Sequence, residues 1–101
     1  MKYEIWYRLE PTFRADPFLK ISDIPLAFAK VRTIEADNLE KVFYEMQGEV
    51  WSPNGEMNGL IKKLGLHHTS MSAGDVAHCI DNDTWSQCAW IGWEDINHEK
   101  I

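Results

Sequence analysis

The sequence predicts an α+β fold, an antiparallel sheet of about four strands with two helices packed on one face. Strand-like alternation of apolar and polar residues lies near both ends of the chain, and helical periodicity lies in the middle. The 101 residues are enough for one hydrophobic core and too few for two independent ones. We therefore expect residues 1–101 to form a single domain with the order strand, loop, strand, helix, helix, strand, strand.

The first strand is expected from Tyr3 to Leu9, where the alternation is regular until Pro11. Residues 10–26 contain three prolines and no sustained period, which predicts a long loop. This loop is rich in apolar residues, so it must either cover one end of the core or cover a partner. Residues 27–34 resume extended character and predict the second strand.

The first helix is the clearest one in the sequence. Asp37 is its expected N-cap, and Glu40 three residues later resembles the second half of a capping box. Gly48 supplies a stop at the C-terminal end. The apolar stripe between these signals consists of Leu39, Val42, Phe43 and Met46.

A second, shorter helix follows and ends at Gly65. Ser52 and Pro53 either belong to a turn before this helix or are its N-cap and first residue. Its apolar stripe consists of Met57, Leu60, Ile61 and Leu64.

The last two strands are expected as a hairpin, residues 76–80 and 85–93, joined at Asn82 and Asp83. A two-residue turn there places Ile80 opposite Trp85. One face then carries Val76, Ile80, Trp85, Ala89, Ile91 and Trp93, and the other carries Ala77, Cys79, Ser86, Cys88 and Trp90. Because both faces are apolar, we expect helices on one and either the long loop or a second subunit on the other, which leaves a homodimer open.

The charge balance is unfavourable for nonspecific nucleic-acid binding, and it fits solubility, a basic protein partner or a DNA-mimicking role. There are 16 Asp and Glu against 10 Lys and Arg, which gives a net charge of -6. The first residues show no charged leader followed by an apolar run, no segment is long enough to span a membrane, and two cysteines make no disulfide framework. These features predict a cytoplasmic protein.

No catalytic motif is present, because the sequence lacks a glycine-rich phosphate loop, a serine elbow and a paired set of carboxylates. We therefore expect no enzymatic activity and no cofactor. The alternative is a small hydrolase or metal protein, with His98 as one further possible ligand. Its centre would be formed by His67, His68, Cys79 and Cys88. The spacing of these residues matches no zinc pattern, so we expect no metal.

Aromatic residues in loops mark the candidate partner-binding positions. Trp51 lies with Asn54 in a connection flanked by glycine and proline, where it either contacts a partner or fills the gap between helices and sheet. Phe13 and Phe18 lie on the long loop, and Trp90 lies in the last predicted strand.

The second alternative is a nucleic-acid-binding regulatory protein. It would use Lys30 and Arg32, which share a face of the second predicted strand, with Lys62 and Lys63 on the polar side of the short helix. Two basic pairs are a small footprint for an acidic chain.

Two runs of the sequence resemble a group of small proteins of bacteriophages, prophages and plasmids. They are residues 46–56, MQGEVWSPNGE, and residues 65–76, GLHHTSMSAGDV. The second run also resembles the turn and strand of YodL-like accessory domains, although this chain has Asn82-Asp83 where those hairpins favour Asp-Gly, and it adds cysteines and a tryptophan in the last strands. The resemblance implies an accessory protein without enzymatic activity that occupies the surface of a host protein, for example as a counter-defence inhibitor.

Overall fold

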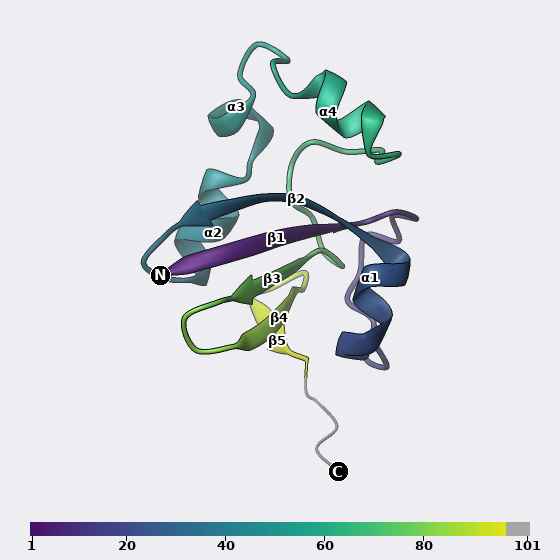
Figure 1. Cartoon of the computed structure of the whole chain (residues 1–101), viewed down its shortest axis with the longest axis vertical. Coiled ribbons are helices and arrows are strands. Elements are labelled where there is room, and N and C mark those ends of the chain that lie inside the picture. The colour runs from purple at the N-terminus through teal and green to yellow at the C-terminus, as the bar shows by residue number, and fades with distance from the viewer. Residues whose placement is uncertain (97–101) are drawn as a thin grey trace.

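The structure, a computed structural model, describes residues 1–96 (Figure 1). Its elements confirm the predicted α+β class. In chain order they are β1 (Lys2–Arg8), the 3-10 turn η1 (Ile21–Asp23), α1 (Ile24–Ala27), β2 (Phe28–Glu35), α2 (Leu39–Glu45), α3 (Gly48–Trp51), α4 (Asn58–Lys63), β3 (Val76–Cys79), β4 (Thr84–Cys88) and β5 (Trp93–Asp95).

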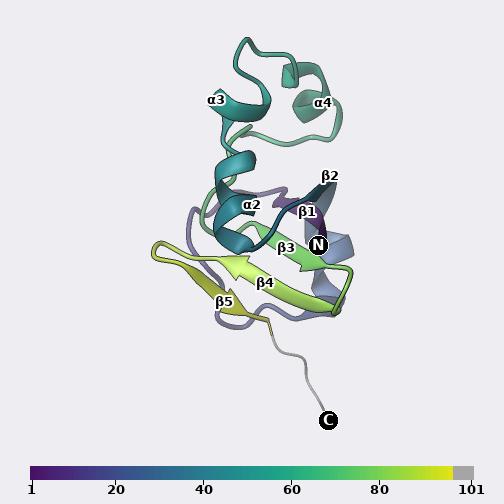
Figure 2. The same ribbon diagram turned by 90° about the vertical axis from the view of Figure 1, so that its left-hand side faces the viewer.

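In this part of the chain the strands form one antiparallel sheet in the order β2-β1-β3-β4-β5. The alternation of β1 has the expected effect, since Tyr3, Ile5 and Tyr7 are all buried on one face. That face packs in the main core against Val42 of α2 and Met46, the residue that follows this helix. Figure 2 shows α2 lying against the sheet, with α3 and α4 extending beyond one end of it.

The other face of the sheet carries a second, smaller core. Ile24 of α1 and Phe28 of β2 are buried there with Val76, and Leu19 and Ile21 pack against them. The second half of the predicted loop therefore packs on its own domain, and it contains η1 and α1 rather than being irregular throughout.

The first helix begins one residue later than its sequence signals predicted. Its N-cap is Asn38, whose Oδ1 accepts a hydrogen bond from the Lys41 amide at 2.9 Å, so Asp37 lies outside the helix. Gly48 does not end α2, because it is the first residue of α3. The connection between the two predicted helices is thus partly helical itself.

A turn separates α3 from α4, which decides between the two interpretations of Ser52 and Pro53. Ser52 Oγ accepts a hydrogen bond from the Met57 amide at 2.9 Å, and α4 starts only at Asn58. The helix ends before Gly65, which takes a left-handed conformation with φ of 76°.

The register of the last hairpin differs from the predicted one by two residues. Cys79 lies opposite Thr84 and His78 opposite Trp85, so the connection has four residues instead of two. Asp83 closes this turn with φ of 55°, in the left-handed region. Because a shift of two residues preserves the side-chain alternation, the faces of the paired residues are as predicted.

The predicted strand over residues 85–93 is broken. β4 ends at Cys88, and the Ala89 amide bonds to the Gly92 carbonyl at 3.0 Å across a tight turn. Gly92 has φ of 75°, which is the reason that the chain can reverse there. Trp93 then pairs with Cys88 in β5 and faces the helices, opposite to its predicted face, and Trp90 lies in the turn.

Candidate functional site

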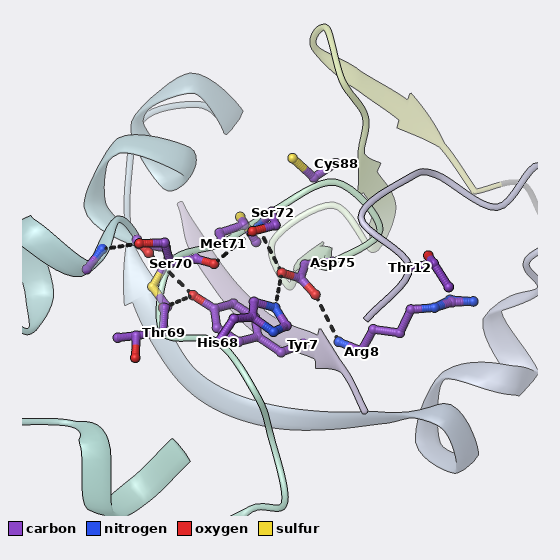
Figure 3. A network of polar contacts seen from close by, with 12 residues as sticks. Tyr7, Arg8, Thr12, His68, Thr69, Ser70, Met71, Ser72, Asp75 and Cys88 are labelled. Carbon is purple, nitrogen blue, oxygen red and sulfur yellow. Dashed lines mark hydrogen bonds and ion pairs between the residues drawn. The ribbon is translucent and has the colours of Figure 1, made fainter. Parts of the chain in front are cut away.

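A buried carboxylate holds together two distant parts of the chain (Figure 3). The Asp75 side chain is 2% exposed, and its Oδ2 lies 2.8 Å from His68 Nε2. It accepts hydrogen bonds from the Arg8 amide and the Ser72 amide, both at 2.9 Å. The end of β1 and the segment before β3 are therefore fixed to each other by one side chain.

His68 and Tyr7 extend this network. Their rings stack with centroids 4.7 Å apart and an interplanar angle of 10°. The single hydrogen of the Tyr7 hydroxyl is shared between the Thr69 carbonyl at 2.7 Å and the more distant Met46 carbonyl at 3.3 Å. Burial, with a smaller contribution from the Asp75 charge, raises the pKa of Tyr7 far above its ordinary value, so the hydroxyl stays a donor.

The geometry of this network suits a structural role better than chemistry. His68 Nδ1 is buried and has no hydrogen-bond partner within residues 1–96. Cys88 is buried, and burial together with Asp75 raises its pKa to about 12, which keeps the thiol protonated at neutral pH. No exposed nucleophile is hydrogen-bonded to the histidine within the part of the chain that the structure describes.

Next to the network lie two adjoining hollows of about 340 and 270 Å³. They share Phe43, Cys88, Ala89 and Trp90 as lining residues. Phe13 lines only the smaller hollow, and Trp93 lines only the larger one.

Three aromatic side chains stand around these hollows, and we name Phe13, Phe43 and Trp90 the aromatic rim. Trp90 is 81% exposed, Phe13 51% and Phe43 39%. Phe13 has a φ of 57°, a conformation that costs a non-glycine residue about 1 kcal/mol or more, and its ring meets His68 edge-on at 6.1 Å. The buried network thus supports one member of the rim directly.

The floor of the hollows is fixed by hydrogen bonds. The Met71 amide donates to the Met46 carbonyl at 3.0 Å, and its carbonyl accepts from Gln47 Nε2 at 3.2 Å. On the other side, Cys88 exchanges backbone bonds of 2.8 Å with Gly74 and Asp75. A surface that is already ordered loses little conformational entropy when a partner binds.

Of the predicted partner-binding residues, only Phe13 and Trp90 lie around one hollow. Phe18 is 83% exposed and lines a different hollow, and Asn54 lies in the turn after α3, where it bonds to Glu56. Phe43 was missed because its helical spacing placed it in the core stripe. Its position beside the hollows gave no separate signal in the sequence.

Trp51 lies on α3 and makes internal contacts. Its Nε1 donates to the Thr69 carbonyl at 3.1 Å, and the Arg32 guanidinium lies 5.2 Å from its ring centroid. These contacts correspond to the gap-filling interpretation, and a role in partner binding stays a prediction.

Replacing Trp51 with phenylalanine tests the structural role. A six-membered aromatic ring is kept while the N–H donor and part of the packed indole are removed, so we expect the free energy of unfolding to fall by at least about 1 kcal/mol in a urea titration. If Trp51 only fills the gap between helices and sheet, partner binding will be unchanged. A loss of binding at full stability would instead place Trp51 in the interface.

The basic residues do not form the predicted pair. Lys30 and Arg32 were expected on one strand face, but a bulge between Ile5 and Trp6 in the β1–β2 register places Lys30 opposite Trp6 and Arg32 opposite Ile5. Lys30 consequently pairs with Glu4 at 3.2 Å on one face, and Arg32 lies over Trp51 on the other. Lys62 and Lys63 are exposed in the last turn of α4.

The proposed His and Cys centre is also dispersed. His67 is exposed, His68 bonds to Asp75, and the Cys79 thiol lies 3.7 Å from the Met1 sulfur. Within residues 1–96 no group of three or more His, Cys, Asp or Glu side chains is arranged to hold a metal ion, and His98 lies outside these residues.

A second polar cluster lies on the opposite face of the sheet. His78 bridges Glu4 at 2.9 Å and Asp83 at 2.7 Å, and its ring stacks on Trp85 with centroids 3.8 Å apart. The hydrogen bond from His78, assisted by Lys30, holds the pKa of Glu4 below its ordinary value of 4.5. Because the shift is downward, the contribution of Glu4 to stability is present above pH 4.5 and is lost as the pH falls below it.

We therefore expect Glu4→Gln to lower the free energy of unfolding by about 1 kcal/mol at neutral pH. The difference between the variant and the natural protein should shrink as the pH falls towards about 3, since protonated glutamate and glutamine are both neutral. Urea titrations over this range measure it, with Glu10→Gln at an exposed position as the control. A difference that is the same at every pH would contradict the role of the Glu4 charge.

Among the described residues no helix has the length and apolar character that crossing a membrane requires. Comparisons with protein-family models, with curated proteins and with solved structures found no match to this chain. The function is therefore inferred from the chain's own sequence, geometry and chemistry.

Proposed function

We propose that this protein is a non-enzymatic binding protein that occupies the surface of another protein through its aromatic rim. The observation that carries the proposal is the exposure of three aromatic side chains around two adjoining hollows with a hydrogen-bonded floor. Large aromatic residues dominate binding energy at protein interfaces, and clusters of them on a surface are typical of interaction sites.

The charges indicate the chemistry of the partner. The chain has a net charge of -6, and the exposed Glu40 lines the larger of the hollows named above. Complementary charge speeds association and excludes partners of the same sign. The partner therefore presents a large apolar side chain that fills a hollow, flanked by lysine or arginine.

The sequence resemblance to small phage and mobile-element proteins extends this proposal. On that basis the partner is a protein of a bacterial host, and binding inhibits it, for example within a defence system. This step depends on the resemblance alone and not on any contact in the fold.

The test is capture from nuclease-treated bacterial lysate with the tagged protein, followed by calorimetric titration of the purified captured protein. Trp90→Ser is the informative variant. Leu26→Ser is its matched control, because Leu26 is 83% exposed, as Trp90 is at 81%, but lines neither hollow. We expect the natural protein and the control to bind equally and the Trp90 variant to bind far more weakly.

Equal binding by the Trp90 variant would refute the rim as the interface. A dimer in sedimentation that Trp90→Ser dissociates would replace the host partner with a second copy of this chain. Capture of nothing, with a monomer in sedimentation, would contradict the binding function itself.

A further inference from the structure

A separate hollow of about 330 Å³ lies in the first half of the loop between β1 and β2. We call it the arginine hollow. Its lining includes Arg8, Thr12, Arg14, Ala15, Asp16 and Phe18. Two of the ten basic residues of an acidic chain thus meet in one depression, next to a single carboxylate.

The Arg8 guanidinium has few partners for its five donor hydrogens. Its Nη1 is buried and makes no hydrogen bond within residues 1–96. Its Nη2 lies 3.5 Å from Asp16 Oδ2, which is long for a charged hydrogen bond. The group is held in place by Phe28, whose ring centroid lies 5.0 Å from the guanidinium carbon. Buried donors are nearly always satisfied in folded proteins, so this one needs an explanation.

Backbone amides in the loop that lines the arginine hollow also lack hydrogen-bond acceptors within the described residues. The amides of Thr12, Arg14 and Ala15 donate no hydrogen bond to any acceptor in the described part of the chain. The loop that carries them is nevertheless fixed. Asp16 bonds through both its amide and its carbonyl to the buried side chain of Gln87, at 2.7 and 3.0 Å.

We propose that the arginine hollow binds the carboxylate of an organic acid that carries an apolar group. Two arginines and one aspartate give the hollow a charge of +1, which a single negative charge neutralises. A guanidinium fork matches a carboxylate in geometry. A doubly charged phosphate would leave an excess negative charge next to Asp16. The exposed ring of Phe18 supplies an apolar wall beside the cationic groups.

This carboxylate has two possible sources, a free small acid or the C-terminal carboxylate of a peptide. None of the three rim residues lines the arginine hollow, although Phe13 lies between Thr12 and Arg14 in the chain. Trp90 lines only the hollows of the rim and Arg14 only the arginine hollow, so variants at these two positions test the two proposals separately.

The test is a ¹H–¹⁵N NMR titration of the full chain with N-acetylphenylalanine, with N-acetylphenylalanine amide as the neutral probe. We expect the acid to shift the amides of residues 12–18 and the neutral probe to leave them unchanged. Arg14→Gln should weaken binding of the acid about tenfold or more, because one charged donor is lost. Lys62→Gln, at an exposed position on α4, controls for the loss of a positive charge and should bind as the natural protein does.

For Asp16→Asn we expect the affinity for the acid to rise instead of fall. The substitution removes the internal carboxylate that competes for Arg8, and the asparagine Oδ1 can still accept from the Phe18 amide, as Asp16 Oδ1 does at 2.9 Å. Binding of the acid should therefore become several-fold tighter. This variant leaves Arg8 in place, so the result does not depend on whether an Arg8 substitution folds.

A short peptide ending in phenylalanine separates the two sources. The peptide with a free C-terminus is compared with the small acid. At least tenfold tighter binding of the peptide would identify a peptide as the source of the carboxylate, and equal binding of the two would indicate a small acid. Equal binding of the acid and the neutral probe, or an unchanged affinity in Arg14→Gln, would overturn the proposal. Tighter binding of inorganic phosphate than of the acid would overturn it as well and show a phosphate site.

Discussion

Replacing Asp75 with alanine is expected to lower the free energy of unfolding by about 3–5 kcal/mol, a larger effect than we expect from Trp51→Phe or Glu4→Gln. The side chain is 2% exposed and is the acceptor for the Arg8 amide, the Ser72 amide and the ring of His68. Alanine leaves these partly buried donors without an acceptor, and each such loss costs about 1–3 kcal/mol. Domains of this size are stable by only about 5–15 kcal/mol, so the variant would be marginal at physiological temperature.

Urea titration followed by tryptophan fluorescence measures the effect. Asp81→Ala is the matched control, because Asp81 also accepts a backbone hydrogen bond, from the Lys2 amide at 3.0 Å, but is exposed. We expect the control to lose no more than about 1 kcal/mol, since water replaces the carboxylate there. A loss of under about 1 kcal/mol in Asp75→Ala as well would mean that the network does not hold the segments together.

The elements of the fold could be predicted from local patterns. The alternation over β1 placed Tyr3, Ile5 and Tyr7 on the buried face, and the apolar stripe of the first predicted helix identified Val42 and Met46. Such patterns report which side of an element is apolar, and burial of that side then fixes its orientation.

The register and the turns could not be predicted in the same way. Nothing local distinguished a two-residue turn at Asn82 and Asp83 from the observed four-residue turn, because both keep the same side chains on each face. The apolar run at Ala89 looked like a continuing strand, and only the positive φ of Gly92 turns it into a loop. That turn exposes Trp90, one of the three residues of the aromatic rim.

Side-chain contacts between different segments also could not be predicted from the sequence. The pairing of His68 with Asp75 joins a loop to the start of β3, and the bonds from Arg8 and Ser72 depend on how that loop meets β1. A bulge of one residue likewise separated Lys30 from Arg32. A single-residue irregularity moves every side chain beyond it to the other face, and no alternation pattern records it in advance.

The second large effect is expected on binding rather than on stability. Trp90→Ser should weaken binding to the partner about 30-fold, since truncation of a tryptophan at an interface centre costs about 2 kcal/mol or more. Because the side chain is 81% exposed, the free energy of unfolding should change by no more than about 0.5 kcal/mol. Calorimetry with the captured partner and a urea titration of the free protein measure the two quantities separately.

A second rim variant makes this prediction sharper. Phe13→Asn removes the ring while keeping a residue that tolerates the left-handed conformation, so the φ of 57° adds no new strain. Phe13 and Trp90 line one hollow, and a partner side chain seated between them contacts both rings. The double variant should therefore lose less binding free energy than the sum of the single losses. Strict additivity would mean that the two rings act independently, and full binding by both single variants at unchanged stability would remove the aromatic rim from the interface.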